Sequence, residues 1–416
     1  MVYPKNIDDA IKEICKIETD VSIIRGIASR AVYLCIHIED VPYYVTSMLK
    51  QEMANCGGEV IVQKDLLMDS LENTNAFIMG NLAQINEMLA RLGSHSEVSS
   101  EIISKIQLVI QSVDEKKTTY YCCRGHKFEI GKKTYLMGIL NITADSFSGD
   151  GLLSGGPSAP FKETINQQVR GINIGDSEAI IEAACRRAET MVANGADIID
   201  VGGESTRPGY RVIDDREELD RILSVVERLV KTLNVPISVD TSKLYVVENV
   251  LSAGAHIIND VSGLIKEPQI AKLAASYGAG VIAMHNPDRS IEGDLLGQII
   301  KTLRKSVDIA ISAGLKQENI ILDPGIGFGV TLEQNLEIVR RLDELKCLGY
   351  PVLLGTSRKS MIGKVLGLPV NERVEGTAAT VALGIAKGVD FVRVHDVGEM
   401  YRVVKMSDAI VRDRYG

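Results

Sequence analysis

Eight short apolar segments recur along the chain after residue 133, and each is followed by a polar or glycine-rich cluster. Between them, apolar residues recur at three- and four-residue steps, which is typical of amphipathic helices. Short buried strands that alternate with helices predict a parallel sheet. Eight such repeats predict a (β/α)8 TIM barrel, whose active site lies at the carboxyl ends of the strands. The segments are TYLMGILN, ADIIDVGGESTRPG, VPISVDTSK, AHIINDVSG, AGVIAMHN, NIILDPGIGFG, YPVLLGTSRKS and VDFVRVHDV.

The first third of the chain has a different pattern. A strand-like segment, 31–40, precedes an amphipathic segment, 41–57, that we expect to be a helix ended by glycine. A short strand and a second helix, 82–92, follow. With 416 residues, the chain is longer than one barrel needs. We therefore predict a smaller N-terminal α+β domain of unknown role at 1–117 and a barrel domain at 118–416, separated by the polar stretch SVDEKKTT.

Two segments of the barrel domain do not fit the regular repeat. Residues 118–133 are interpreted as a β-hairpin that turns at Gly131 and covers the bottom of the barrel. Residues 149–176 form an insertion between the first strand and its helix, far longer than the roughly two to six residues usual there. Long loops at a catalytic face are often functional, but the Gly, Ser and Pro content also suits a tolerated surface insertion.

The composition is that of a globular protein with a large core, with 45% hydrophobic and 24% charged residues. A net charge of −9 disfavours a nucleic-acid-binding surface, so we expect small-molecule partners. The N-terminal residues lack the basic and apolar regions of a signal peptide, and no apolar run approaches the roughly 20 residues of a membrane span. The seven cysteines lack paired zinc spacing. These features predict a cytoplasmic protein with reduced thiols and no membrane segment.

Polar residues end the first strand segment, where Asn141 is followed by Thr143, Asp145 and Ser146. An amide and a carboxylate at this place could hold a magnesium ion, because hard cations prefer oxygen ligands. The same residues could instead form a local Asx-turn. This motif alone does not separate the two alternatives.

The second strand segment ends in two glycines, followed by Ser205, Thr206, Arg207 and Pro208. The glycines permit close approach of the backbone, and the proline stiffens the loop. A guanidinium group binds phosphate or carboxylate through two parallel hydrogen bonds. Arg207 is therefore a candidate anion ligand, although a single loop arginine often only faces solvent.

Carboxylates and an amide end the third, fourth and sixth strand segments, as Asp240, Asn259 with Asp260, and Asp323. If they converge in one cavity, they suit a heterocycle rich in N–H donors and ring nitrogens, since buried polar atoms need partners. Each aspartate could instead cap the next helix. That alternative is strongest for Asp260 and weakest for Asp323, whose following glycines leave backbone room for a ligand.

Cations gather at the ends of the last two strand segments. Ser357, Arg358 and Lys359 lie in TSRKS, and Arg393 and His395 lie in VRVHD. Barrels commonly bind phosphate at this edge, so the cluster predicts an anionic ligand. Because adjacent side chains diverge, we expect Lys359 rather than Arg358 to face inward.

These motifs, in this order over residues 118–416, resemble those of the dihydropteroate synthase family. The resemblance rests on NITADSFS, GGESTRPG, SVDTSK, IINDVSG, DPGIGFG, LGTSRKS and RVHD. It implies a transferase of folate biosynthesis, in which para-aminobenzoate displaces diphosphate from 6-hydroxymethyl-7,8-dihydropterin diphosphate to form 7,8-dihydropteroate. It also implies a Mg²⁺ cofactor, a homodimer and competition by sulfonamides, which mimic aminobenzoate.

The resemblance implies roles for individual residues. The pterin ring would lie among Asp240, Asn259, Met284, Asp323, Gly355 and Lys359. Diphosphate and magnesium would lie near Asn141, Arg207, Arg393 and His395, with Asn141 as the metal ligand. Aminobenzoate would lie near Thr206, Arg207, Pro208, Phe328, Ser357 and Lys359. The implied catalytic residues are Asp323, Lys359, Arg207 and Asp240, with Asp323 stabilising positive charge on the ring and no protein nucleophile.

The first loop departs from the family, because Ala144 stands where the family usually has proline and SFSGDG replaces the usual SFSDGG. Two alternatives share the pterin cavity. A methyltetrahydrofolate-corrinoid methyltransferase does not need the STRPG, SRKS and RVHD cations, and a non-catalytic pterin-binding module has no use for a leaving-group site. All three motifs are present, which favours the synthase.

Overall fold

The computed structural model describes the chain as two compact units. One comprises Met1–Thr118 with Lys346–Gly349, and the other comprises Thr119–Leu345 with Tyr350–Gly416. The described residues are 7–17, 21–62, 73–93, 100–113, 120–142, 177–204, 213–287, 291 and 293–412. The domain boundary expected near residue 117 and the insertion expected at 149–176 lie outside the described residues.

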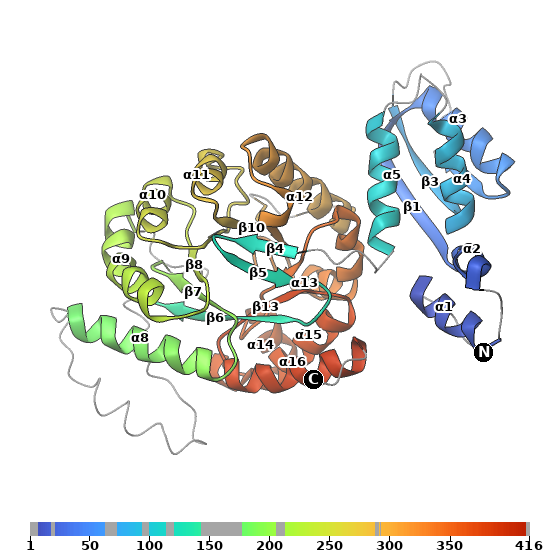
Figure 1. Cartoon of the computed structure of the whole chain (residues 1–416). Helices are drawn as coiled ribbons and strands as arrows, with labels where there is room; N and C mark the ends of the chain where they lie inside the picture. The colour runs from blue at the N-terminus through green and yellow to red at the C-terminus, as the bar shows by residue number, and fades with distance from the viewer. Residues whose placement is uncertain are drawn as a thin grey trace. The chain divides into compact units, whose positions relative to one another are not determined.

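The N-terminal unit, blue to cyan in Figure 1, is an antiparallel sheet with helices. Its strands are β1 (Tyr33–Pro42), β2 (Glu59–Val62) and β3 (Asn73–Asn81), in the order β1-β3-β2. Its helices are α1 (Ile7–Cys15), α2 (Val21–Ala31), α3 (Tyr43–Asn55), α4 (Leu82–Leu92) and α5 (Ser100–Val113). Buried positions alternate along β3, so one face of the sheet joins a core with α3, α4 and α5.

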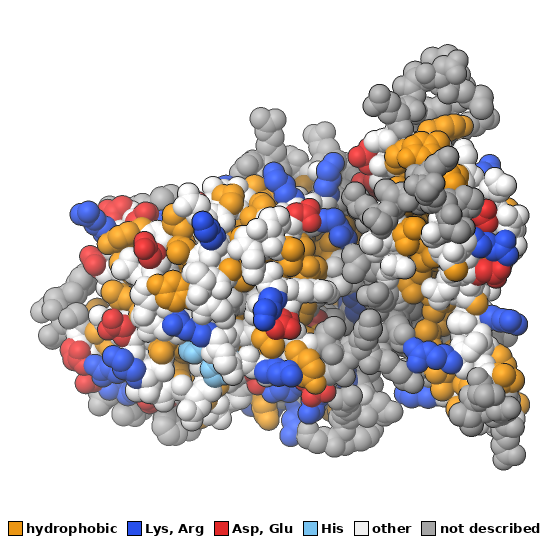
Figure 2. All heavy atoms as spheres, turned by 45° about the horizontal axis from the view of Figure 1, so that its top comes forward, with side chains coloured by type: hydrophobic (Ala, Val, Ile, Leu, Met, Phe, Trp, Pro, Cys, Tyr) orange, Lys and Arg blue, Asp and Glu red, His pale blue; other side chains and the backbone are white. Residues whose placement is uncertain are grey.

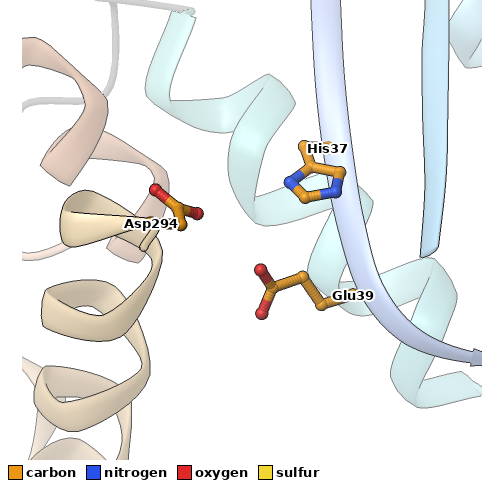
Figure 3. Close-up of side chains that lie close together, drawn as sticks. All are labelled: His37, Glu39 and Asp294. Carbon is orange, nitrogen blue, oxygen red and sulfur yellow. The ribbon is translucent and has the colours of Figure 1, made fainter. Parts of the chain in front are cut away.

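The opposite face of β1 carries His37 and Glu39, which are exposed and two residues apart, so that both project to the same side (Figure 3). Figure 3 also draws Asp294, which precedes α12 (Leu295–Ser312). Because these three residues belong to two separate units, we assign no metal site to them.

The second unit is a barrel of eight parallel strands. They are β6 (Tyr135–Asn141), β7 (Ile198–Gly202), β8 (Ile237–Asp240), β9 (Ile257–Asp260), β10 (Gly280–Met284), β11 (Ile320–Asp323), β12 (Leu353–Leu354) and β13 (Phe391–Val394). Their order is β11-β10-β9-β8-β7-β6-β13-β12. The ring closes where the backbone N–H of Leu322 donates to Pro351 O beside β12 (2.9 Å). The predicted (β/α)8 barrel and its eight strands are confirmed.

Helices follow the strands and surround them (Figure 1). Besides α12, they are α8 (Ser177–Ala193), α9 (Asp215–Thr232), α10 (Leu244–Ser252), α11 (Gln269–Tyr277), α13 (Leu332–Arg340), α14 (Ser360–Leu366), α15 (Val374–Ala386) and α16 (Val397–Val411), with short 3-10 turns at Gln317–Asn319, Leu342–Leu348 and Val370–Glu372. Helix α9 begins where Asp214 accepts the N–H of Glu217 (2.8 Å), and it buries one apolar stripe against the barrel.

A hairpin precedes the barrel. Strands β4 (Tyr120–Cys123) and β5 (His126–Glu129) are joined by Arg124 and Gly125, whose φ angles are 39° and 90°. The predicted turn at Gly131 is therefore wrong, and Gly131 lies in the following turn that leads into β6. A two-residue hairpin loop of type I′ needs positive φ at both positions, and an arginine at the first of them does not predict such a loop.

The hairpin packs against the amino-terminal ends of the barrel strands. Tyr121 is fully buried, and its ring lies edge-on to Phe391 at a centroid distance of 5.7 Å. The N–H of Arg124 donates to Gly278 O (2.9 Å), and its guanidinium donates to Leu251 O (2.7 Å). The polar ends of the barrel strands therefore lie at the opposite end of the barrel.

None of the helices in the described ranges is long and apolar enough to cross a membrane. On the face drawn in Figure 2, basic and acidic side chains are interspersed.

Candidate active site

Arg393 joins the carboxyl ends of three barrel strands. From β13, its Nε donates to Asp200 Oδ2 on β7 (2.6 Å), and its Nη2 donates to Asp240 Oδ2 on β8 (2.7 Å). Asn259 on β9 donates from Nδ2 to the same oxygen of Asp200 (3.3 Å). Four side chains from separate strands therefore form one polar network across the mouth of the barrel, in which Asp200 and Asn259 are buried and Asp240 and Arg393 partly buried.

The charges of this network influence one another. Burial raises the pKa of Asp240 to about 7, although the Arg393 guanidinium opposes the shift. Burial disfavours the charge on Arg393, but Asp200 and Asp240 outweigh it and raise the pKa of Arg393. The guanidinium is therefore held as a cation, whereas Asp240 can gain or lose a proton near neutral pH.

Asp323 ends β11 and lies 7% exposed. Its Oδ1 accepts the backbone N–H of Gly325 (2.7 Å), which fixes the carboxylate on the following turn. Gly325 has φ of 76°, and a Cβ there would lie 1.8 Å from His285 O, so only glycine fits. Burial raises the pKa of Asp323, and the nearby cation of Lys359 partly offsets this effect.

Lys359 approaches the same side of the barrel from the segment after β12. Its Nζ donates to Ile326 O and lies 4.6 Å from the centroid of the Phe328 ring. Burial lowers the pKa of Lys359 to about 8, against the opposing effect of Asp323. At neutral pH the side chain is mainly a cation and a hydrogen-bond donor.

The neighbouring residue, Arg358, is directed away from Lys359. It has a positive φ of 57°, and its guanidinium forms a two-point ion pair with Asp396. Its N–H donates to Thr377 Oγ1 (3.1 Å), and Arg373 donates to its carbonyl oxygen (3.0 Å). These contacts fix the backbone so that Lys359, and not Arg358, reaches the polar network.

Ser357 and His395 connect the ends of β12 and β13. Ser357 Oγ accepts the backbone N–H of His395 (3.1 Å) and lies 3.0 Å from its Nδ1. Gly355 lies between the two halves of the site, because a Cβ there would be 3.8 Å from Asp323 Oδ2 and 3.9 Å from Arg393 Cβ. A ligand can therefore approach the backbone at Gly355 closely.

Two other predicted residues border the same region. Met284 is buried at the end of β10 and pairs in register with Asp323. Asn141 ends β6, and its Oδ1 lies 3.2 Å from where a Cβ of Gly202 would be. That same Cβ position is 3.8 Å from Asp240 Cβ, so Asn141 and Asp240 flank one glycine. The remaining predicted residues, Thr143, Asp145, Ser146, Thr206, Arg207 and Pro208, lie outside the described residues.

One buried residue of the network was not predicted. Asp200 lies in the apolar run of β7 and is fully buried. The available signal was its position two residues before Gly202, because alternate residues of a strand face the same side. Asp260, by contrast, is a structural residue. Its carboxylate accepts hydrogen bonds from Ser242 Oγ (2.5 Å), the N–H of Ser262 (2.8 Å) and the N–H of Leu264 (2.7 Å).

The site therefore combines carboxylate acceptors with partly buried cations at one end of a barrel. The chain is similar in sequence to known proteins. Residues 175–395 match the pterin binding enzyme family. The chain is 48% identical over 287 residues to the dihydropteroate synthase of Clostridium beijerinckii, over 69% of this chain and 97% of that relative. The chain belongs to the dihydropteroate synthase family.

A solved dihydropteroate synthase from Clostridium difficile, in the presence of pteroic acid, has the same barrel. It is 48% identical, with a TM-score of 0.61 over 68% of this chain and 99% of that chain. A probable bifunctional folylpolyglutamate synthase/dihydropteroate synthase from Halobacterium salinarum is 38% identical over 370 residues, over 87% of this chain and 41% of that protein. Since the barrel unit is less than three quarters of the chain, this similarity extends into the N-terminal unit.

Family membership gives the activity of the chain. It is a transferase that condenses 6-hydroxymethyl-7,8-dihydropterin diphosphate with para-aminobenzoate to 7,8-dihydropteroate and diphosphate. Its substrates are small molecules. This is the activity that the motifs predicted, and it is favoured over the corrinoid methyltransferase and the non-catalytic module.

Proposed function

We propose that the pterin ring of the substrate binds at the carboxyl ends of β8, β9 and β11. The observation that carries this proposal is the pairing of two acceptors, the partly buried Asp240 and the buried Asp323, with two donors, the buried Asn259 and the partly buried Lys359. A pterin presents both N–H donors and ring acceptors, each of which needs a partner once buried. The proposed pterin site is Asp240, Asn259, Met284, Asp323, Gly355 and Lys359.

The diphosphate is assigned to the edge formed by β12 and β13. Arg393 uses Nε and Nη2 to hold Asp200 and Asp240. Its Nη1 has no hydrogen bond to any residue in the described part of the chain, so it can donate to a phosphate oxygen. His395 lies on the same side, beside Ser357. Arg207, outside the described residues, completes the proposed set.

Asn141 is the proposed ligand of Mg²⁺. Its amide makes no hydrogen bond with the residues that the structure describes, and its Oδ1 lies beside Gly202 at the strand ends. A magnesium ion keeps several waters and is usually bound by one or two protein carboxylates together with substrate phosphates. Asn141 would supply one oxygen ligand here, and water and the substrate diphosphate would supply the others. Bound there, the ion would neutralise charge on the departing diphosphate.

Aminobenzoate is assigned to the space beside the pterin methylene. Phe328, Ser357 and Lys359 form one wall, and the 4.6 Å distance from Lys359 Nζ to the Phe328 ring links two of these residues. Thr206, Arg207 and Pro208 form the other proposed wall and lie outside the described residues. An aromatic ring packs well against Phe328, and the carboxylate suits a cation.

The proposed reaction needs no protein nucleophile. The bond between the pterin methylene and the diphosphate breaks first, and the positive charge spreads over the dihydropterin ring. The carboxylate of Asp323 stabilises that charge, because a fixed buried charge is most effective where water is excluded. The amine of aminobenzoate then attacks the methylene carbon and loses a proton. Lys359 donates a hydrogen bond to the ring throughout.

Equilibrium binding of the pterin diphosphate tests the pterin assignment. Asn259→Leu replaces the amide by an apolar side chain with the same branching, and we expect affinity to fall by about tenfold or more. Asp260→Asn is the matched control, because Asp260 is a buried aspartate on the same strand whose carboxylate serves only protein groups. It should lower the melting temperature and leave pterin affinity unchanged. Equal affinity in both variants would contradict the assignment.

The proposal includes a homodimer in the cytoplasm. Helices α15 and α16 carry exposed apolar side chains, among them Leu383 (58% exposed) and Ile410 (71% exposed), with Tyr401 and Met406 on α16. The two helices pack against each other, and exposed apolar side chains on neighbouring helices favour a protein interface. All seven cysteines are free thiols, which is typical of a reducing compartment.

A further inference from the structure

The two chain ends that flank residues 205–212 are held together by side chains. Ile213 follows this segment, and its backbone N–H donates to Glu204 Oε1 (3.1 Å), on the residue that precedes the segment. Its carbonyl oxygen accepts a hydrogen bond from Lys243 Nζ (2.7 Å). Both polar backbone groups of Ile213 are therefore fixed by side chains.

Lys243, just after β8, is at the centre of this arrangement. Besides Ile213 O, its Nζ contacts Glu204 Oε2 (2.8 Å) and Glu218 Oε2 (2.7 Å). An ammonium group has three N–H donors, and three oxygens surround this one. Glu218 is only 1% exposed, so water does not replace Lys243 as its partner. We name Glu204, Glu218 and Lys243 the loop anchor.

Helix α9 carries further contacts of the same kind. Gly203, just before the segment, accepts a hydrogen bond at its carbonyl oxygen from Arg221 Nη1 (3.0 Å), and Arg221 also pairs with Glu217 (2.5 Å). A Cβ on Gly203 would lie 2.8 Å from Ile222 Cγ2, so the backbone is packed directly against the helix. Both sides of the segment are therefore tied to α9, which carries Glu218 as well.

We propose that Lys243 is a positioning residue for the reaction, which fixes the two ends of the chain segment that contains Thr206 and Arg207. The inference rests on the proposed function, in which these two residues contact aminobenzoate and diphosphate. A segment with fixed ends has fewer conformations to lose when its residues bind a ligand. In the described part of the chain, no hydrogen bond or ion pair of the loop anchor goes to a proposed pterin residue. Glu218 acts on Asp240 only through its charge, so the main effect of the anchor is expected on aminobenzoate rather than on the pterin.

The test compares three full-length variants. Lys243→Met removes the anchor, Lys243→Arg keeps its charge, and Arg412→Met breaks a similarly enclosed ion pair, with Asp408, at the opposite end of the barrel. We expect Lys243→Met to raise the KM for aminobenzoate about tenfold, with the dissociation constant of the pterin diphosphate within about twofold of the parent. Lys243→Arg should recover most of the loss. Arg412→Met should change only the melting temperature.

Hydrogen exchange of the Ile213 amide gives a readout that does not depend on catalysis. We expect faster exchange in Lys243→Met and in Glu204→Leu, which removes the acceptor of that amide, and parental exchange in Arg412→Met. Glu204→Leu serves where Lys243→Met does not fold. Parental exchange at Ile213, or an equal rise in the constants for both substrates, would overturn the proposal.

The failure of the proposed function would look different. If Arg207→Ala leaves the KM for aminobenzoate unchanged, the assignment of that residue fails, while exchange at Ile213 still reports on the anchor. Faster exchange of the Ile213 amide in Lys243→Met would then still show that Lys243 fixes the two chain ends. In that case the predicted effect on aminobenzoate would be wrong.

Discussion

Replacing Asp323 by asparagine separates charge from shape at the proposed centre of the site. The Oδ1 atom of Asp323 accepts the N–H of Gly325 (2.7 Å), and an asparagine amide oxygen can keep that bond. The turn after β11 is therefore preserved, and burial of a neutral amide is less costly than burial of a carboxylate. We expect Asp323→Asn to fold as stably as the parent or more stably.

The expected loss of activity follows from the lost charge. A hydrogen bond to a charged group contributes about 1.5 to 3 kcal/mol, which corresponds to about 10-fold to 150-fold in kcat/KM. The charge of Asp323 also raises the pKa of Lys359, which burial lowers to about 8. Without that charge the pKa of Lys359 falls further. The lysine then loses its proton, and the enzyme its activity, at a lower pH than in the parent.

The assay is kcat/KM for the pterin diphosphate between about pH 6 and about pH 10, with aminobenzoate saturating. Asp408→Asn is the control, because Asp408 pairs with Arg412 at the other end of the barrel. It should keep the pH profile and lose only stability. The reasoning is refuted if Asp323→Asn keeps full activity, or if it loses activity with no shift of the alkaline limb.

Three other predictions follow from single residues. Burial raises the pKa of Asp240 to about 7, so between about pH 4 and pH 7 the folded state holds a proton that the unfolded state releases. The free energy of unfolding should therefore fall as pH rises through this range. In urea titrations, Asp240→Asn should lose this dependence on pH. Gly355→Ala should keep the melting temperature within about 2 °C, because its Cβ fits the free site, but it should weaken pterin binding. Gly325→Ala should unfold at a lower temperature, because its Cβ would lie 1.8 Å from His285 O. Ile410→Lys should convert a dimer to a monomer in sedimentation velocity, and a parent that is already monomeric would contradict the proposed interface.

The barrel was predictable because its signals are local. Each strand is a short apolar run with its polar residues at the carboxyl end, and the helices between carry their own period and caps, as α9 does with Asp214. Parallel strands then bring the polar ends to one edge. Strand β3 was not predicted, because its sequence NTNAFIMGN begins with polar residues and includes a glycine.

The partners within the site could not be predicted in the same way. The ion pair of Arg393 with Asp200 joins residues that are 193 positions apart, and no local pattern encodes it. The inward direction of Lys359 was predicted from the divergence of adjacent side chains, but its cause was not: it is the left-handed backbone of Arg358 and the ion pair of Arg358 with Asp396. Motif spacing identifies which residues reach the mouth of the barrel, whereas tertiary contacts decide which of them bind one another.

The most direct test of the account is diphosphate release by the purified chain, given 6-hydroxymethyl-7,8-dihydropterin diphosphate and Mg²⁺, with and without para-aminobenzoate. The account predicts release that depends on aminobenzoate, with one 7,8-dihydropteroate formed for each diphosphate. Tight binding of the pterin substrate without any such release would contradict it.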